Sequence, residues 1–258
     1  MGGDDVDETM GLLSKRRSFL ASLQDSPKEK PALASDCGVA RSTVDRAIRE
    51  LEVAGLVDRG DDGFELTIPG RLVFDQFRAF ERSIDAICSA DDWLPMLPRH
   101  DIVDPVMLLG GEVTRADIHA PDKAMQETLD LVSTAARVRG VSPAVHGAYV
   151  ETFDDRIQNE GMDTDLVFSA DALTELTTTY AEYMRKEFPE NVSIYQIDEL
   201  PPLGLMLVDH EDGTTEASFG LYTDNGVQVV VRNTADAAVD WLTREFEAYR
   251  DRATEIQL

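Results

Sequence analysis

The sequence predicts an α+β protein in which an N-terminal winged helix-turn-helix is followed by a linker helix and a C-terminal α/β domain with a mixed sheet. Two patterns carry this prediction. Three short amphipathic helices and a hairpin fall within residues 11–69, and strand and helix signals alternate within residues 99–258. The length of 258 residues is enough for two domains that each bury a core.

The N-terminal elements follow one another closely. Residues 1–10 are acidic and polar, and we expect them to form a disordered tail. Helices are expected over 14–24 and 32–37, and a third begins at Ser42, a good N-cap, and ends at Gly55. Three apolar residues at helical spacing predict the buried face of this third helix: Val44, Ile48 and Leu51.

A hairpin and a long helix come next. Residues 56–59 and 64–68 alternate between apolar and polar side chains around a Gly-Asp-Asp-Gly turn. Residues 70–98 are expected to form a linker that consists of a helix and a proline-bounded segment. Apolar residues on this helix recur at steps of four, three, four and three, the spacing of a coiled-coil seam: Val73, Phe77, Phe80, Ile84 and Ile87. This stripe either packs against its own domain or pairs with its copy in a homodimer.

The remaining residues predict a sheet that is parallel in part and ends in an antiparallel meander. Strands are expected over 106–118, 140–145, 165–168, 192–197, 203–209, 216–222 and 227–232. Helices are expected over 121–139, 149–158 and 170–187, with a last helix that carries Trp241 and Phe246.

The charge of the chain is unevenly distributed. There are 24 Lys+Arg against 50 Asp+Glu, a formal net charge of -26. Residues 11–82 hold both signs in equal number, whereas residues 83–258 hold most of the excess carboxylates. We interpret the acidity, together with the preference for arginine over lysine, as a halophilic adaptation to a salt-rich cytoplasm. The alternative is an acidic surface that repels DNA or binds a basic partner.

The third helix has the polar face that a DNA-reading helix needs, because such a helix turns its apolar side to the core and its polar side to the major groove. Arg46 is the first candidate for bidentate recognition of guanine, and Arg49 for a phosphate clamp. The candidate DNA-binding residues are Arg41, Ser42, Thr43, Asp45, Arg46, Arg49, Lys15, Arg16 and Arg59, with Arg17 beside Arg16.

Asp45 is unexpected on such a face, since a carboxylate repels phosphate. It either accepts a hydrogen bond from a cytosine amine or pairs with Arg41 or Arg49. The hairpin tip, Asp61-Asp62, is also acidic and disfavours deep insertion into the minor groove.

In the C-terminal domain, polar residues follow the predicted strand ends, where α/β sheets place ligands. Residues 119–122 open a helix whose N-terminal amides favour an anion. The candidate effector-binding residues are His119, Asp122, His146, Tyr149 and Asp209. Either these side chains converge on one pocket, or they are turn residues without a ligand.

The sequence lacks the common patterns of catalytic and metal sites. It has no phosphate-binding glycine loop, no Gly-x-Ser-x-Gly elbow and no His-Glu-x-x-His helix, and Cys37 and Cys88 show no zinc-site spacing. We therefore expect no catalytic residue, metal or cofactor. No apolar run approaches the roughly 20 residues of a membrane span, and the acidic start is unlike a signal peptide. These features predict a cytoplasmic protein with no membrane partner.

Several ordered stretches match one family, over about residues 10–255. They are Ser42-Thr43-Val44-Asp45-Arg46-Ala47-Ile48-Arg49-Glu50-Leu51, Gly63-Phe64-Glu65-Leu66-Thr67, Trp93-Leu94-Pro95, Val138-Arg139-Gly140-Val141-Ser142-Pro143, Glu160-Gly161-Met162 and Leu200-Pro201-Pro202-Leu203-Gly204-Leu205. With them the sequence resembles archaeal winged-helix transcriptional regulators, abundant in haloarchaea, whose C-terminal part is similar to the middle domain of the methanogenesis and filament-growth regulator of methanogens.

This resemblance implies transcriptional control, with the C-terminal part as an effector-sensing and oligomerisation module. Related sugar-responsive regulators have a sensor similar to the phospholipase D fold. Here His119 and Lys123 do not form the His-x-Lys-x4-Asp signature of that enzyme. The expected fold is therefore phospholipase-D-like without the catalytic motif.

We accordingly expect a sequence-specific regulator that binds double-stranded DNA as a homodimer and is controlled by a small-molecule effector or a partner protein. The alternative is a hydrolase or transferase whose winged helix serves only for protein interaction. The operator, the identity of the effector and the choice between activation and repression are not predicted by the sequence.

Overall fold

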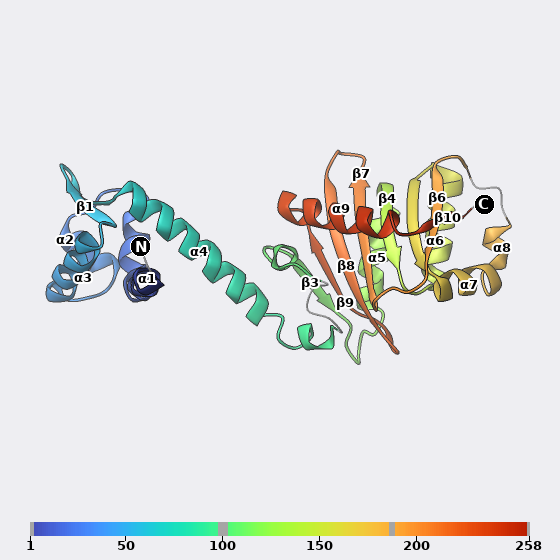
Figure 1. Ribbon diagram of the computed structural model, residues 1–258, viewed down its shortest axis with the longest axis horizontal. Coiled ribbons are helices and arrows are strands. Elements are labelled where there is room, and N and C mark those ends of the chain that lie inside the picture. The colour runs from blue at the N-terminus through green and yellow to red at the C-terminus, as the bar shows by residue number, and fades with distance from the viewer. Residues whose placement is uncertain (1–2, 98–102, 186–188, 257–258) are drawn as a thin grey trace. The chain divides into compact units, whose positions relative to one another are not determined.

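The computed structural model describes residues 3–97, 103–185 and 189–256, and Figure 1 shows its helices and strands. The chain divides into two units, Met1–Ile84 and Asp85–Leu258. The division falls inside the expected linker over 70–98, of which residue 98 lies outside the described part of the chain. Each unit is described by itself.

The N-terminal unit is a winged helix-turn-helix, as predicted. Its elements are α1 (Gly3–Leu23), α2 (Lys30–Asp36), α3 (Arg41–Val53), β1 (Val57–Gly60), β2 (Gly63–Leu66) and α4 (Ile68–Cys88). The helices bring one apolar face each to a shared core, in which Leu20, Ile48 and Phe74 are fully buried. Strands β1 and β2 pair antiparallel, with Gly60 opposite Gly63.

Two predicted boundaries in this unit differ from the structure. Helix α1 begins at Gly3, so residues 3–10 are helical where we expected a disordered tail. Packing explains the difference, because Met10 contributes to the same core as Leu13, one turn further along. Helix α3 begins before Ser42, since the carbonyl of Ala40 already accepts the first helical hydrogen bonds. Ser42 is therefore not the N-cap.

The C-terminal unit is built on an eight-stranded mixed sheet in the order β10-β6-β5-β4-β7-β8-β9-β3. The strands are β3 (Glu112–Arg115), β4 (Ala135–Ser142), β5 (Asp163–Ser169), β6 (Val192–Ile197), β7 (Leu203–His210), β8 (Thr215–Thr223), β9 (Gly226–Asn233) and β10 (Thr254–Ile256). β4, β5 and β6 run parallel, and β7, β8 and β9 form the predicted antiparallel meander.

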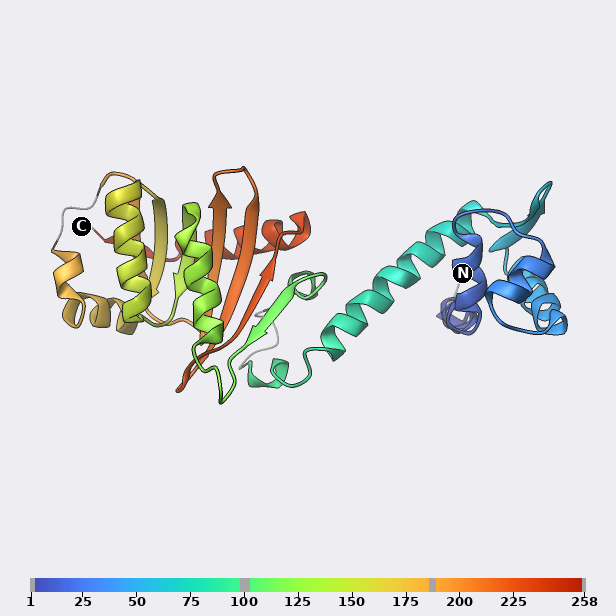
Figure 2. The same cartoon turned by 180° about the vertical axis from the view of Figure 1, so that it is seen from behind.

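Helices cover both faces of this sheet. Helix α9 (Asp236–Arg250) crosses one face in Figure 1, and α5 (Lys123–Ser133) and α6 (Gly147–Glu160) cross the other in Figure 2. The main core lies under α9, where Leu242 and Phe246 pack with Leu207 and Phe219 of the sheet. The remaining helical segments are α7 (Ala170–Thr178), α8 (Ala181–Met184) and the short 3-10 turns η1 (Leu94–Met96) and η2 (Pro105–Met107).

Some expectations for this unit were wrong. The helix expected over 121–139 ends at Ser133, and the residues after Thr134 form β4. The Ala-Ala-Arg-Val-Arg run has fair helix propensity, but two neighbouring strands pair with it, and such tertiary pairing overrides local preference. The helix expected over 170–187 is interrupted after α7, and β10 was not expected at all.

The described part of the chain contains no helix that combines the length and apolar character needed for a membrane crossing.

Candidate functional site

Helix α3 presents a charged face opposite its buried one. Val44, Ala47 and Ile48 are buried in the N-terminal core, which turns the other side of the helix to solvent. The expected reading residues lie on that side, where Thr43 is half-buried and the others are exposed: Arg41, Ser42, Asp45, Arg46 and Arg49. An edge of this kind can donate arginine hydrogen bonds to base edges or phosphates.

Glu50 organises the cations beside this face. It accepts hydrogen bonds from Lys15 at 3.0 Å and from Arg16 at 3.0 Å, both on α1, and from Nε of Arg46 at 3.0 Å, one turn earlier on α3. The hydrogen bonds from Lys15 and then Arg16 lower the pKa of Glu50 to about 2. About 73% of the Arg46 side chain stays exposed, so its terminal nitrogens remain available.

Glu50→Gln is expected to lower the melting temperature at neutral pH, because the ionised carboxylate attracts three cations. A pKa below the ordinary 4.5 means that this stabilisation is complete above about pH 4.5 and is lost as the pH falls toward about 2. The gap between wild type and variant should therefore be constant from pH 7 to pH 5 and close below that, as thermal melts followed by circular dichroism would show. Exposed Glu52→Gln is the matched control, and a gap independent of pH would contradict the prediction.

Arg16 differs from the role expected of it. Its side chain is only 8% exposed and pairs with Glu50, so it stabilises the position of α3 instead of providing an exposed cation for DNA phosphates. Arg17 is exposed and pairs with Glu81 of α4 at 3.1 Å. Within the described residues, Arg41 and Arg49 form no ion pair with any carboxylate, which leaves two unpaired guanidinium groups on the α3 face.

Asp45 pairs with neither of the partners expected for it. Its carboxylate accepts a hydrogen bond of 2.6 Å from Lys30 at the start of α2. This contact explains how a carboxylate is tolerated on the face, since Lys30 neutralises it. The same Lys30 ammonium lies 5.5 Å from the ring centre of Phe64 in the wing, which is the hairpin of β1 and β2.

The wing is anchored by Phe64 and carries Arg59 at its edge. The Phe64 backbone exchanges two hydrogen bonds of 2.9 Å with Lys28, so the hairpin is tied to the segment before α2. The Arg59 guanidinium lies 5.1 Å from the Phe64 ring centre and donates to Glu29 at 3.1 Å. Arg59 is thus an exposed cation whose position is defined by the wing.

The apolar stripe of α4 is divided among three environments. Val73 and Phe77 pack into the core of the N-terminal unit, and Ile87 packs against the core of the C-terminal unit. Phe80 and Ile84 remain 52% and 44% exposed. The stripe therefore packs in part within its own chain, and only Phe80 and Ile84 are left for a partner.

The C-terminal unit contains a cavity of about 140 Å³ on the α6 side of the sheet. Helix α6 contributes Tyr149 and Phe153, and α7 and α8 contribute further apolar side chains. The floor includes Gly204 of β7 and Gly220 of β8, which face each other across the two strands.

The structure divides the five expected effector residues. Tyr149 lines the cavity, and His146 lies beside it, with ring centres 5.6 Å from Tyr149 and 6.1 Å from Tyr222. His119, Asp122 and Asp209 are not lining residues. Asp209 instead accepts hydrogen bonds from Thr215 at 2.7 Å and from Arg139. Because Asp209 is two residues after buried Leu207 in β7, its side chain lies on the α9 side of the sheet. The five side chains therefore do not converge.

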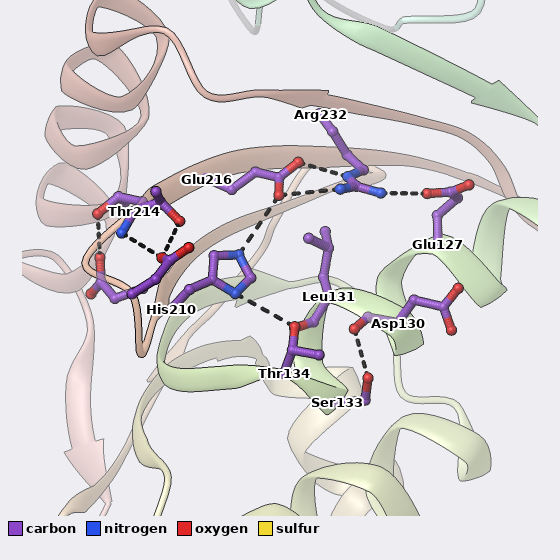
Figure 3. A network of polar contacts seen from close by, with 12 residues as sticks. Glu127, Asp130, Leu131, Ser133, Thr134, His210, Thr214, Glu216 and Arg232 are labelled. Atoms are coloured by element: carbon purple, nitrogen blue, oxygen red, sulfur yellow. Dashed lines mark hydrogen bonds and ion pairs between the residues drawn. The ribbon is translucent and has the colours of Figure 1, made fainter.

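A second polar cluster joins α5 to the meander (Figure 3). Arg232 of β9 donates to Glu216 of β8 at 2.7 Å and to Glu127 of α5 at 2.7 Å. His210 of β7 lies 3.7 Å from Glu216 and beside Thr134. The hydrogen bond to Glu216, followed by that to Glu127, raises the pKa of Arg232 well above its usual range. Every charge in this cluster has a partner, which indicates a structural role.

Sequence reasoning missed residues at both sites. The sequence could have predicted the pairing of Arg46 with Glu50, because the two residues are one helical turn apart. Lys30 and Phe64 gave no such local signal, since their contacts join separate elements. In the cavity, the signal for Gly204 and Gly220 was glycine inside a strand, which commonly marks a close approach.

A winged helix-turn-helix with an exposed arginine face, followed in the chain by an α/β unit, is the arrangement of a winged-helix transcription regulator. The chain belongs to the family of the methanogenesis regulatory protein FilR1, whose middle domain matches residues 121–252, half of the chain. Residues 4–88 match the HVO_A0261 N-terminal domain. No curated protein is similar to the chain at a significant level.

Three solved structures with a similar fold are distant relatives of the chain. The archaeal chromatin protein TrmBL2 is 13% identical with a TM-score of 0.43, over 97% of this chain and 99% of that one. The phospholipase D family member Nuc from Salmonella typhimurium is 12% identical with a TM-score of 0.44, over 57% and 99%. NucT from Helicobacter pylori is 9% identical with a TM-score of 0.44, over 57% and 98%. Similarities this weak indicate nothing about function.

Proposed function

We propose that this protein is a sequence-specific regulator that binds double-stranded DNA through α3, acts as a homodimer and is controlled by a small molecule through its C-terminal unit. One observation carries the proposal: Arg41, Arg46 and Arg49 stand on the exposed side of a helix whose opposite side is locked in the core. A surface helix of this shape fits the major groove.

Close contacts would dominate the affinity. The N-terminal unit has no excess of positive charge to attract DNA from a distance, and the body is acidic. In a molar-salt cytoplasm, the Debye length of about 3 Å would screen such attraction further. Direct hydrogen bonds from Arg46 to a guanine edge, and from Arg49 to a phosphate, then supply most of the binding energy.

A dimer would give two reading heads for a pseudo-palindromic operator. Of the predicted stripe on α4, Phe80 and Ile84 support it, because they are large, apolar and exposed. Val73, Phe77 and Ile87 pack in the cores of their own units and are left out of this interface.

Arg46→Ala is expected to weaken operator binding about 10- to 100-fold and to relax the preference for one base pair. Arg49→Ala is expected to weaken all sequences alike and to reduce the slope of log K against log salt by about 1. Fluorescence anisotropy with an operator found by genome-wide occupancy mapping measures both, and the stoichiometry of the complex should be two chains per operator.

Arg244→Ala provides the matched control, since Arg244 is an exposed arginine on α9. It should bind like wild type, and all three variants should keep the wild-type circular dichroism spectrum. Undiminished specific binding by the Arg46→Ala, Arg49→Ala double variant would exclude α3 as the reading helix.

A further inference from the structure

The cavity of the C-terminal unit has an apolar lining with few polar groups. Phe153 and Ile157 of α6, and Leu166 and Ile194 of the sheet, supply much of its wall. Among the described residues that line it, Asp154 is the only charged one, and no arginine or lysine takes part. A lining of this kind favours an uncharged ligand and gives no countercharge to an anion.

Glycines in the strands create the space. A Cβ atom at Gly204 would lie 2.9 Å from Cε2 of Tyr222, so any side chain there would displace the tyrosine ring. At Gly220 a Cβ would meet Tyr222, Val227 and Val230 only at 3.7–3.8 Å, ordinary contact distances. Glycine at both positions therefore keeps the floor low beneath α6, at a cost in strand stability that a filled core would not require.

Several hydroxyl groups interrupt the apolar lining, among them those of Tyr149 and Ser218. The Tyr149 hydroxyl is buried within reach of Thr128, but forms no hydrogen bond of normal geometry with the described residues. Burial raises the pKa of Tyr149, so its hydroxyl is a neutral donor at physiological pH. The buried Ser218 hydroxyl likewise has no side-chain hydrogen bond within the described part of the chain. Both could bond to a ligand.

The size of the cavity narrows the ligand further. About 140 Å³ is close to the roughly 150 Å³ of an engineered apolar cavity that holds benzene. A single six-membered ring fills such a volume. A sugar of the same size would bury about five hydroxyls in a lining that is mostly apolar and cannot pair with all of them.

We propose that this cavity binds a small, uncharged ring compound, aromatic or alicyclic, that carries one hydrogen-bonding group directed at Tyr149 or Ser218. The site deepens the proposed function, because such a compound would be the effector. Binding itself is independent of DNA and can be tested on its own.

Phenol and toluene are the probes, with glucose as the polar comparison, and binding to the full-length protein is measured by ligand-observed NMR titration. Phenol and toluene should bind saturably at one site per chain, and glucose should not. Tyr149→Phe should weaken phenol roughly three- to tenfold and leave toluene unchanged, because one hydrogen bond is lost. Tyr195→Phe, on the opposite face of the sheet, is its matched control.

Ser218→Leu places a larger side chain in the cavity and should weaken the binding of both probes at least tenfold. Val239→Leu, in α9 on the other face of the sheet, should leave their binding unchanged. If Ser218→Leu does not fold, Gly220→Ala adds a methyl group at ordinary contact distances and should weaken toluene measurably. Absence of saturable binding, equal binding by the filled variant, or binding of glucose alone would overturn the proposal.

Measuring operator affinity by fluorescence anisotropy with and without phenol separates ligand binding in the cavity from the proposed regulatory function. Phenol binding that changes operator affinity supports both. Phenol binding without any effect on DNA affinity supports the cavity and overturns its role as the effector site.

Discussion

Replacing Trp93 with alanine is expected to lower the free energy of unfolding of the C-terminal unit by about 3–5 kcal/mol. Trp93 is 1% exposed, and its ring centre lies 5.7 Å from that of Phe219 at an angle of 50°. It packs in the core under α9, so truncation leaves a cavity the size of an indole where the sheet and the chain before η1 meet. The cost is the lost transfer free energy together with the cavity.

Both tryptophans of the chain lie in this unit, so Trp241 fluorescence still reports its unfolding in the variant. Urea titration measures the change. Met96→Ala, in η1 and 46% exposed, is the matched control and should stay within about 0.5 kcal/mol of wild type. A loss below about 1 kcal/mol for Trp93→Ala would show that this segment is outside the cooperative core.

Trp93→Phe should cost much less than Trp93→Ala. The indole N–H of Trp93 is buried and has no acceptor among the described residues. Phenylalanine keeps most of the apolar contact and removes the unsatisfied donor. The gain from removing this donor partly offsets the apolar contact that is lost.

Trp93 also shows what a single sequence can and cannot predict about the fold. Val44, Ile48 and Leu51 revealed their burial through local spacing, and the structure buries all three. The Pro-bounded segment around Trp93 has no such period, so it read as a linker. Its partner Phe219 lies far along the chain, and only tertiary packing brings the two together.

The two candidate sites also differ in how far the sequence could predict them. The exposed arginines of α3 were predictable because one helix sets both its faces. Whether the candidate effector-binding residues share one pocket could not be predicted, since this depends on the strand order and on the face of the sheet that each side chain takes. One position of register decides that Asp209 points to the α9 side while its neighbour His210 points to the α5 side.

Arg232→Met is expected to lower the free energy of unfolding of the C-terminal unit by about 2–3 kcal/mol. The variant leaves Glu216, which is only 10% exposed, and Glu127 without their cation. Removing one partner of a fully buried pair costs about 3–5 kcal/mol, and partial exposure of Arg232 reduces that figure.

The pKa of Arg232 is raised, so its guanidinium stays charged and the stabilisation that it provides would be lost only at strongly alkaline pH. The deficit of the variant relative to wild type, measured by urea titration of tryptophan fluorescence, should therefore be the same at pH 7.5 and at pH 9.

A second substitution tests whether the stranded charge, rather than lost packing, is responsible. Arg232→Met with Glu216→Gln should recover much of the stability that Arg232→Met alone loses, because the double variant buries no uncompensated carboxylate at position 216. Exposed Arg244→Met serves as control for the loss of an arginine. Strictly additive losses in the double variant would mean that the contacts of Glu216 and Arg232 are independent. The cluster would then fasten α5 to the meander through packing alone.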